Sequence, residues 1–291
     1  MAQVKIFADS TADLSEQLIT QLGITIIPLK VHINGETYLD GQTIHAAMFY
    51  EKLKAASELP TTSQPSPLDF AEAFKKAIHE GTKEIFSIHI SSVMSGTYQS
   101  AVLAKGMIEE EYPEVKIEVM DSKTVSSPLG WIVTMVGRAA RDGASLAEIH
   151  ALAKRVREHQ RIALAIDTLV YLQKGGRIGK AASLVGSLLN IKPVISVSDE
   201  GEVTPIDKAR GKNKAKNKVF ELLQADIPAG PVNASIFHSD QADEVDAMIE
   251  KLKMIYEIQD LQVTNIGPIV GTHLGPGAIG CVVVPLEKVF A

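Results

Sequence analysis

Short apolar runs alternate with segments of helical spacing through the first half of the chain. Runs rich in Ile and Val are typical of buried strands, whereas apolar residues at every third or fourth position are typical of amphipathic helices. These patterns predict strands at residues 4–8, 24–33, 84–90, 115–120 and 162–166, and helices at 14–22, 44–56, 68–79, 96–111, 129–141 and 146–158. Such regular alternation favours a parallel sheet with helices on both faces.

The second half has a different pattern. Two short strand-like runs flank Asp199-Glu200-Gly201, which predicts a hairpin. Helices are then expected at residues 213–223 and 242–256, and strands at 232–237, 261–265 and 278–284. We therefore expect an α/β protein of two closely packed domains, residues 1–160 with a parallel sheet and residues 161–291 with a mixed sheet.

Composition and charge exclude several classes of protein. The 291 residues are 45% hydrophobic and 22% charged, as in a folded globular protein. The net charge of −6 argues against a general nucleic-acid binder. A single cysteine, Cys281, excludes an intrachain disulfide and a cysteine-based metal cluster. With no apolar leader run and no apolar stretch of about 18 residues, we expect a cytoplasmic protein without a membrane span.

Polar residues follow three of the predicted strands, at residues 9–11, 91–97 and 121–124. In open parallel sheets, ligands bind beyond the carboxyl ends of the strands. Ser95 precedes a helix, whose free backbone N–H groups favour an anion, and Gly96 would let a ligand approach the backbone. Helix capping also explains such hydroxyls, and we expect Asp13 and Ser15 to cap the first helix.

Other segments carry weaker signals. The polar stretch 60–67, which includes Thr62 and Ser63, is expected to be a loop. Residues 275–280 match G-x-G-x-x-G, but a strand follows them instead of a helix, so they do not predict a dinucleotide site. Arg177, in a glycine-rich segment, fits either an anion-binding residue or a surface arginine. The lone His273 fits a structural role, and G-x-S-x-G, S-x-x-K and H-E-x-x-H motifs do not occur.

A basic run stands out in this acidic protein. It places six cations within eleven residues: Lys208, Arg210, Lys212, Lys214, Lys216 and Lys218. Cations at a helix start oppose the helix dipole, so a purely structural design would avoid them. Both a solvated face and a docking surface for an acidic partner fit this pattern.

Taken together, several blocks resemble the DegV family over nearly the whole chain, as one module over residues 3–290. The blocks are Ala8-Asp9-Ser10-Thr11-Ala12-Asp13-Leu14, Thr62-Ser63-Gln64-Pro65-Ser66, Ser92-Val93-Met94-Ser95-Gly96-Thr97-Tyr98-Gln99-Ser100-Ala101, Gly175-Gly176-Arg177-Ile178, Asn190-Ile191-Lys192-Pro193-Val194 and His273-Leu274-Gly275-Pro276-Gly277-Ala278. Characterised bacterial members of that family are the fatty-acid-binding subunits of fatty acid kinase.

The resemblance implies a two-domain DegV-like fold, with an α/β/α first domain, that holds one long-chain fatty acid such as palmitate in a buried tunnel. Its carboxylate would be held by Thr62 or its neighbour Ser63, by Ser95 beside Gly96, and by His273, with Arg177 as a further member. The protein would have no catalytic residues and no cofactor. It would present the fatty acid to a separate ATP-dependent kinase, and the acyl phosphate would feed phospholipid synthesis.

Two other hypotheses stay open from the residues alone. One is a serine-dependent hydrolase of lipid esters that acts through Ser95 and His273, against which the missing nucleophile elbow counts. The other is a binder of a different small anionic metabolite at the same strand ends. In the kinase hypothesis, the residues from Lys208 to Lys216 are the expected docking surface, and transient contact with a membrane surface is compatible with the sequence.

Overall fold

A four-stranded parallel sheet forms the centre of the N-terminal half. The structure, a computed structural model, describes residues 4–186 and 191–290. The strands lie in the order β2 (Thr25–Ile27), β1 (Lys5–Asp9), β6 (Glu84–His89) and β7 (Lys116–Asp121). Side chains of β1 alternate between two cores, with Phe7 on one face of the sheet and Ile6 and Ala8 on the other.

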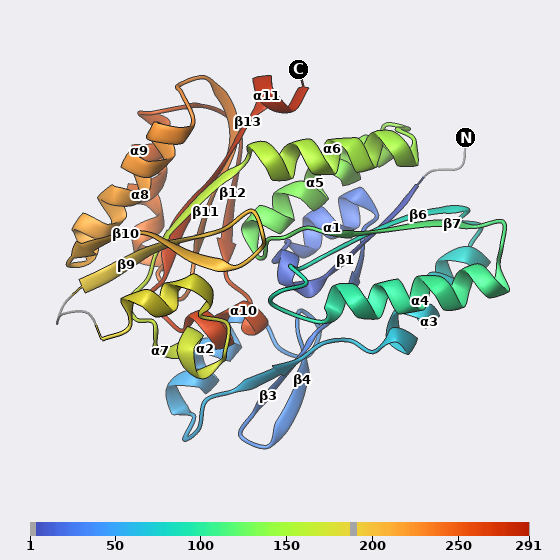
Figure 1. The fold of residues 1–291 in the computed structure, drawn as a ribbon, viewed down its shortest axis with the longest axis horizontal. Coiled ribbons are helices and arrows are strands. Elements are labelled where there is room, and N and C mark those ends of the chain that lie inside the picture. The colour runs from blue at the N-terminus through green and yellow to red at the C-terminus, as the bar shows by residue number, and fades with distance from the viewer. Residues whose placement is uncertain (1–3, 187–190, 291) are drawn as a thin grey trace.

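Helices cover both faces of this sheet, as the sequence predicts (Figure 1). The helices on the Phe7 face are α3 (Pro67–His79) and α4 (Thr97–Glu111). Those on the opposite face are α1 (Glu16–Leu22) and α5 (Ser127–Arg141), and α6 (Leu146–His159) packs in the same core. The Ser15 side chain accepts a hydrogen bond from the backbone of Leu18 and so caps α1 as expected.

A six-stranded mixed sheet forms the C-terminal half. Its order is β10 (Val203–Arg210), β9 (Ile191–Val197), β8 (Arg161–Ala165), β13 (Ile279–Pro285), β11 (Pro231–His238) and β12 (Glu257–Asn265). Only the β11–β12 pair is parallel among these described strands. The predicted hairpin is confirmed, since β9 and β10 pair antiparallel. The parallel and mixed sheets together confirm the predicted α/β class.

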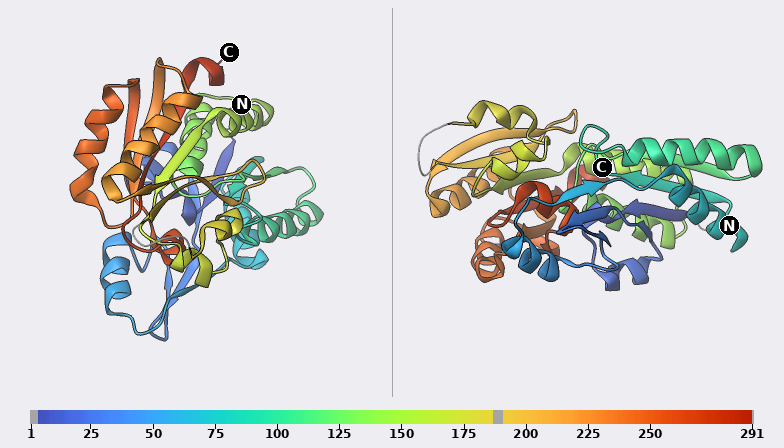
Figure 2. Two further views of the ribbon diagram at one scale, coloured as in Figure 1. Left: turned by 60° about the vertical axis from the view of Figure 1, so that its left-hand side comes forward. Right: turned by 90° about the horizontal axis from the view of Figure 1, so that it is seen from below.

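The mixed sheet has helices on both of its faces. Its outer face packs against α8 (Lys212–Asp226) and α9 (Val245–Lys253). Its inner face packs against α5 and α6, so these two helices lie between the sheets (Figures 1 and 2). The fully buried Trp131 of α5 and Phe237 of β11 belong to this shared core. The proposed domain boundary at residue 160 falls between α6 and β8 and stays a prediction.

A small third sheet lies at the lower end of the molecule in Figure 1, in the order β4 (Glu36–Leu39), β3 (Lys30–Ile33) and β5 (Thr61–Ser63). The single strand expected at residues 24–33 is therefore two strands in different sheets, separated at Pro28, which lacks a backbone donor. The stretch 60–67 is not only a loop, because β5 occupies part of it. Phe49 of α2 (Ala46–Ala55) packs with Ile269 of α10 (Pro268–Leu274) and so joins this sheet to the C-terminal half.

Sequence periodicity did not predict α10, a short helix that begins with Pro268. The remaining short elements are η1 (Ser10–Ala12), α7 (Val170–Lys174), η2 (Gly179–Leu184), η3 (Ala242–Glu244) and α11 (Leu286–Phe290). In the described part of the chain, none of the helices has the length and apolar character needed to cross a membrane.

Candidate ligand-binding site

A cavity of about 410 Å³ lies between the carboxyl ends of the parallel strands and the inner face of the mixed sheet. Residues that follow β2, β6 and β7 line one side, and residues of β8 to β11 line the other. The apolar lining is Leu29, Ile90, Met94, Val125, Ile162, Leu164, Leu172, Ile195, Val197, Val203, Phe237, Ile269, Val270 and Leu274. This volume falls in the range of small-molecule sites.

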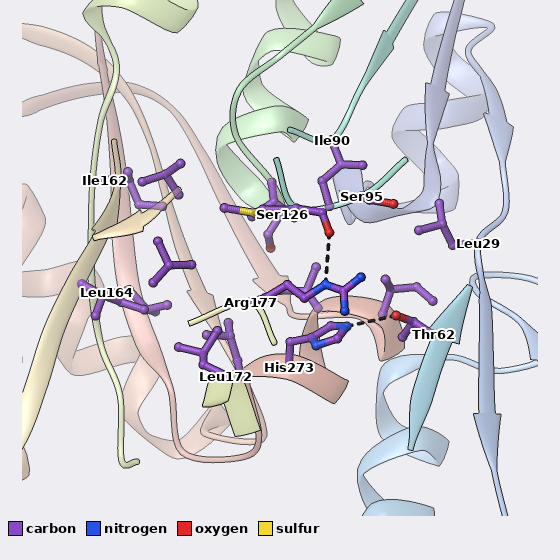
Figure 3. Close-up of a pocket in the computed structure, with 18 of the residues that line it drawn as sticks. Leu29, Thr62, Ile90, Ser95, Ser126, Ile162, Leu164, Leu172, Arg177 and His273 are labelled. Atoms are coloured by element: carbon purple, nitrogen blue, oxygen red, sulfur yellow. Dashed lines mark hydrogen bonds between the residues drawn. The ribbon is translucent and has the colours of Figure 1, made fainter. Parts of the chain in front are cut away.

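Four polar side chains gather at one side of this cavity, away from Ile162 and Leu164 (Figure 3). They come from four separate segments: Thr62 from β5, Ser95 from the turn before α4, Arg177 from the loop after α7 and His273 from α10. The structure thus brings together every principal site residue predicted from the sequence. Outside this region and the adjoining Ser63 and Gln64, the lining is apolar except for Ser126 and Ser196, whose hydroxyls donate to Asp13 and to the backbone oxygen of Ile162.

Thr62 and His273 form a hydrogen-bonded pair, with 3.0 Å between Thr62 Oγ1 and His273 Nε2. Burial, together with the positive charge of Arg177, lowers the pKa of His273 to about 4, so the imidazole is neutral at pH 7. His273 Nδ1 is buried and makes no hydrogen bond to any described residue. A proton on Nε2 is therefore favoured, and Nε2 then donates to Thr62 and leaves the threonine hydroxyl free to donate to a ligand.

Gly175 makes room for this arrangement. A Cβ atom at Gly175 would lie 2.3 Å from His273 Nδ1 and 3.0 Å from the backbone oxygen of Tyr171. Any side chain at this position would displace the imidazole from Thr62. The glycine of the Gly175-Gly176-Arg177 segment therefore has a packing role that the sequence did not reveal.

The Arg177 guanidinium is held by two backbone carbonyls. Nε donates to the oxygen of Met94 at 3.2 Å, and Nη1 donates to the oxygen of Gly175 at 2.8 Å. Nη2 makes no hydrogen bond within the described residues. Arg177 is thus fixed in place with donors left for an anion.

Ser95 and Gly96 occupy the start of α4, as predicted. Ser95 Oγ lies 2.9 Å from Thr97 Oγ1, and Gly96 is the N-cap residue without a side-chain cap. A Cβ at Gly96 would lie 2.3 Å from Gln64 Oε1, so a side chain there would require the Gln64 amide to move. Gln64 itself donates to Ser100 Oγ at 3.3 Å, which ties β5 to α4.

The neighbouring hydroxyls of Thr62 and Ser63 have different partners. Successive side chains of a strand point to opposite faces. Accordingly, Thr62 pairs with His273, whereas Ser63 Oγ lies 2.9 Å from His32 Nε2 on the neighbouring strand β3. The hydroxyl of Ser63 is thus already engaged away from the His273 pair.

Buried carboxylates beside the cavity were not recognised from the sequence as a site. Ser126, which lines the cavity at a φ of 61°, donates to Asp13 Oδ2. Asp13 Oδ1 accepts from the backbone N–H of Gly267 at 3.1 Å, so Asp13 joins the two halves and does not cap α1. Burial, with the nearby charge of Asp40, raises the pKa of Asp13 well above its usual value. Burial also raises the pKa of Asp40 to about 7.

The basic run is spread over β10 and α8, and several of its charges are neutralised within the chain. Lys212 pairs with Asp167 at 2.8 Å, and Lys216 pairs with Glu244 at 2.6 Å. Lys218 contacts two further carboxylates, those of Asp207 and Glu221. In residues 4–186 and 191–290 no ion pair involves the exposed Lys208, Arg210 and Lys214.

The geometry does not assemble a serine hydrolase from Ser95 and His273. Ser95 bonds to Thr97 and His273 bonds to Thr62, and among the described residues no carboxylate bonds to His273. A Ser–His–Asp chain does occur elsewhere, from Ser87 Oγ to His89 Nε2 at 2.6 Å and from His89 Nδ1 to Asp9 Oδ2 at 3.1 Å. These three residues are fully buried, so no substrate can approach the serine. In the described chain no group of three His, Cys, Asp or Glu residues could hold a metal ion.

A second depression, of about 770 Å³, adjoins the polar region from outside. Thr62, Arg177 and His273 line both the inner cavity and this outer depression. The polar side chains therefore stand between an apolar interior and the surface. Fold and site together define an α/β protein with a cavity suited to a small molecule that has an apolar body and an anionic or polar head.

Comparison with known proteins agrees with this class. The sequence model of the DegV family, described as an uncharacterised protein family, matches residues 3–286. A DegV domain-containing protein of Halalkalibacterium halodurans is 34% identical over 96% of this chain and 98% of its own length. One from Clostridium acetobutylicum is 36% identical, with 95% of this chain and 96% of the relative covered. The chain belongs to the DegV family.

Solved structures of similar fold are described by the ligands they bind. A DegV family protein from Thermus thermophilus, described by its fatty acid binding, has a TM-score of 0.90 and 33% identity over 97% of this chain and 99% of its own. A stearic-acid-binding protein from Eubacterium ventriosum has a TM-score of 0.89 and 28% identity over 99% of each chain. DegV from Bacillus subtilis, described as a fatty acid binding protein, has a TM-score of 0.86 and 29% identity, with 98% and 99% covered. These descriptions agree with the expected fatty-acid-binding role.

Proposed function

We propose that this protein binds one long-chain fatty acid, such as palmitate, with its acyl chain in the 410 Å³ cavity and its carboxylate at Thr62 and Ser95, where His273 orients the Thr62 hydroxyl. The observation that supports this most directly is the separation of the lining into a large apolar surface and one polar region. A sugar or phosphometabolite would leave most of the apolar lining unused. The fatty acids described for structures of 28–33% identity support the same ligand class.

The energetics of this complex are favourable. Burial of an acyl chain contributes about 0.8 kcal/mol per CH₂ group, so a chain of sixteen carbons supplies most of the affinity. Burial of a carboxylate without hydrogen bonds costs free energy, so hydrogen bonds to the head group are needed to keep the affinity that the acyl chain supplies. Thr62 and Ser95 offer hydroxyl donors, and Arg177 offers the positive charge.

The experiment that tests the ligand is native mass spectrometry of the freshly purified protein, followed by identification of the released molecule. We expect a stoichiometric long-chain fatty acid, and we expect Ser95→Ala to retain less of it because the carboxylate loses one donor. A protein that is empty and also takes up no added palmitate would contradict the proposal. Release of a different anionic metabolite would establish the alternative ligand class.

The same proposal extends to a role in fatty-acid activation. The carboxylate would be presented to a separate ATP-dependent kinase, which makes the acyl phosphate that feeds phospholipid synthesis. Support comes from the outer depression, which adjoins Thr62, Arg177 and His273 and would let a phosphate donor approach the head group. Neutral His273 would keep Thr62 oriented at pH 7 without adding a charge.

The unpaired cations of the basic run are the candidate kinase-docking surface. Lys212 and Lys216 are less suitable for its test than the sequence suggested, because they already hold carboxylates of this chain. We expect charge reversal at Lys208, Arg210 and Lys214 together to lower kinase-dependent phosphorylation at least about threefold at low salt, since each exposed charge pair contributes roughly 0.2–1 kcal/mol. Palmitate binding should be unchanged, and equal phosphorylation rates would contradict the docking surface.

A further inference from the structure

The outer depression contains one cation that the fatty-acid-binding role does not use. Its lining includes Lys174 and Arg177 as basic residues and Glu58 as an acidic residue. Lys174 ends α7 and is exposed, and within the described residues it forms no ion pair. Arg177 lines both spaces, whereas Lys174 lines only the outer one. Arg177 therefore lies at the junction with the inner cavity, and Lys174 lies farther out.

We propose that the outer depression is the binding site for the phosphate group of the acyl phosphate, and that Lys174 is the phosphate-contacting residue which the fatty acid itself does not need. This inference rests on the proposed function. With the acyl chain fixed in the inner cavity, a phosphoryl group added to the carboxylate extends the head group outward, past Thr62, Arg177 and His273, into the depression.

The charge change of the reaction favours a second cation near the head group. A carboxylate oxygen of the fatty acid attacks the γ-phosphorus of ATP, the bond from that phosphorus to the bridging oxygen of the β-phosphate breaks, and ADP leaves with the electron pair. No proton is transferred. The head group thereby changes from a charge of about −1 to about −2 near neutral pH. Arg177 offers one positive charge, and Lys174 supplies the second where the added charge appears.

The side chains fit these separate tasks. Arg177 is held by the carbonyls of Met94 and Gly175, so it keeps one position at the junction of the two spaces. Lys174 carries a compact ammonium charge at the end of a flexible side chain, which suits contact with a phosphate oxygen. Lys174 is one residue from Gly175, whose carbonyl accepts from Arg177, so the two cations share a local framework.

The test compares two ligands that share a C16 chain, palmitate and monohexadecyl phosphate. Their dissociation constants are measured by calorimetry at low salt for the wild type, for Lys174→Ala and for Lys174→Glu. We expect Lys174→Ala to weaken monohexadecyl phosphate about fivefold and Lys174→Glu to weaken it further, with palmitate affected less than twofold. The matched control is Lys154→Ala, an exposed lysine on α6 that does not line the depression.

The outcomes separate this inference from the function on which it rests. If the wild type binds palmitate and Lys174 variants bind monohexadecyl phosphate as tightly as the wild type does, the role of Lys174 is wrong. If the wild type binds palmitate but no monohexadecyl phosphate, the depression does not hold the phosphate group. If the wild type binds neither ligand, the fatty-acid function itself fails.

Discussion

Thr62→Val is expected to weaken palmitate binding by about 10- to 100-fold. Valine has nearly the same shape as threonine, so the change removes the hydroxyl and leaves the packing of β5 intact. A hydrogen bond to a charged group contributes about 1.5–3 kcal/mol, and its loss leaves a buried carboxylate lacking one donor. His273 Nε2 also loses its partner at the same time. Displacement of a fluorescent fatty acid, with circular dichroism as a check on folding, measures this effect.

Two adjacent residues provide matched controls for this prediction. Thr61→Val makes the same chemical change one position earlier on β5, where the side chain is exposed and does not line the inner cavity. Ser63→Ala removes the hydroxyl that bonds to His32 and should cost palmitate affinity much less than Thr62→Val does. If Ser63→Ala has the larger effect, then Ser63 and not Thr62 holds the carboxylate.

Much of the fold could be predicted from the sequence because most elements have a clear apolar period. The buried strand β6 and the amphipathic helix α3 are examples, with Ile85 and Phe86 on the strand and Phe70 and Phe74 on the helix. Short polar elements have no apolar period and could not be predicted in this way. The strand β5 consists of Thr61-Thr62-Ser63 and forms because β3 offers it an edge, a contact between distant segments that has no local signal.

The polar side of the site was more predictable than its apolar side. Ser95 could be inferred from hydroxyls at a strand end, while Thr62, Arg177 and His273 were assigned a common site only through family resemblance. The cavity itself could not be predicted from the sequence, because lining residues such as Leu164 and Phe237 are as apolar and as buried as ordinary core residues. Whether an apolar side chain meets another side chain or an enclosed space depends on the packing of two sheets, which periodicity does not encode.

Asp13 shows the same limit for a polar residue. Its position before α1 matched a helix cap, but its φ of 51° turns the carboxylate inward to Ser126 and Gly267. Those partners are more than one hundred residues away in the sequence. The consequence is a pair of carboxyl groups with raised pKa values, the half-buried Asp13 and the buried Asp40.

Asp40→Asn is expected to stabilise the protein at pH 8 by up to roughly 4 kcal/mol. Burial raises the pKa of Asp40 from the usual 3.8 to about 7, and Oδ2 has no hydrogen-bond partner in the described structure. Between pH 4 and 7 the unfolded chain has already lost this proton while the folded chain retains it, so the free energy of unfolding falls as pH rises. The full cost is present above pH 7, at about 1.36 kcal/mol per unit difference between the two pKa values.

Urea unfolding of the wild type and of Asp40→Asn at several pH values from 4 to 8 measures this contribution. The two curves should lie close together near pH 4, where Asp40 is protonated in the folded state, and should separate as pH rises to 7. His273 contributes with the opposite sign, because its lowered pKa makes stability rise with pH between about 4 and 6.5, but it does so equally in both proteins.

Asp199→Asn, at a fully exposed carboxylate, is the matched control and should follow the wild type. Parallel curves for the wild type and Asp40→Asn would mean that Asp40 is ionised in the folded protein at all these pH values.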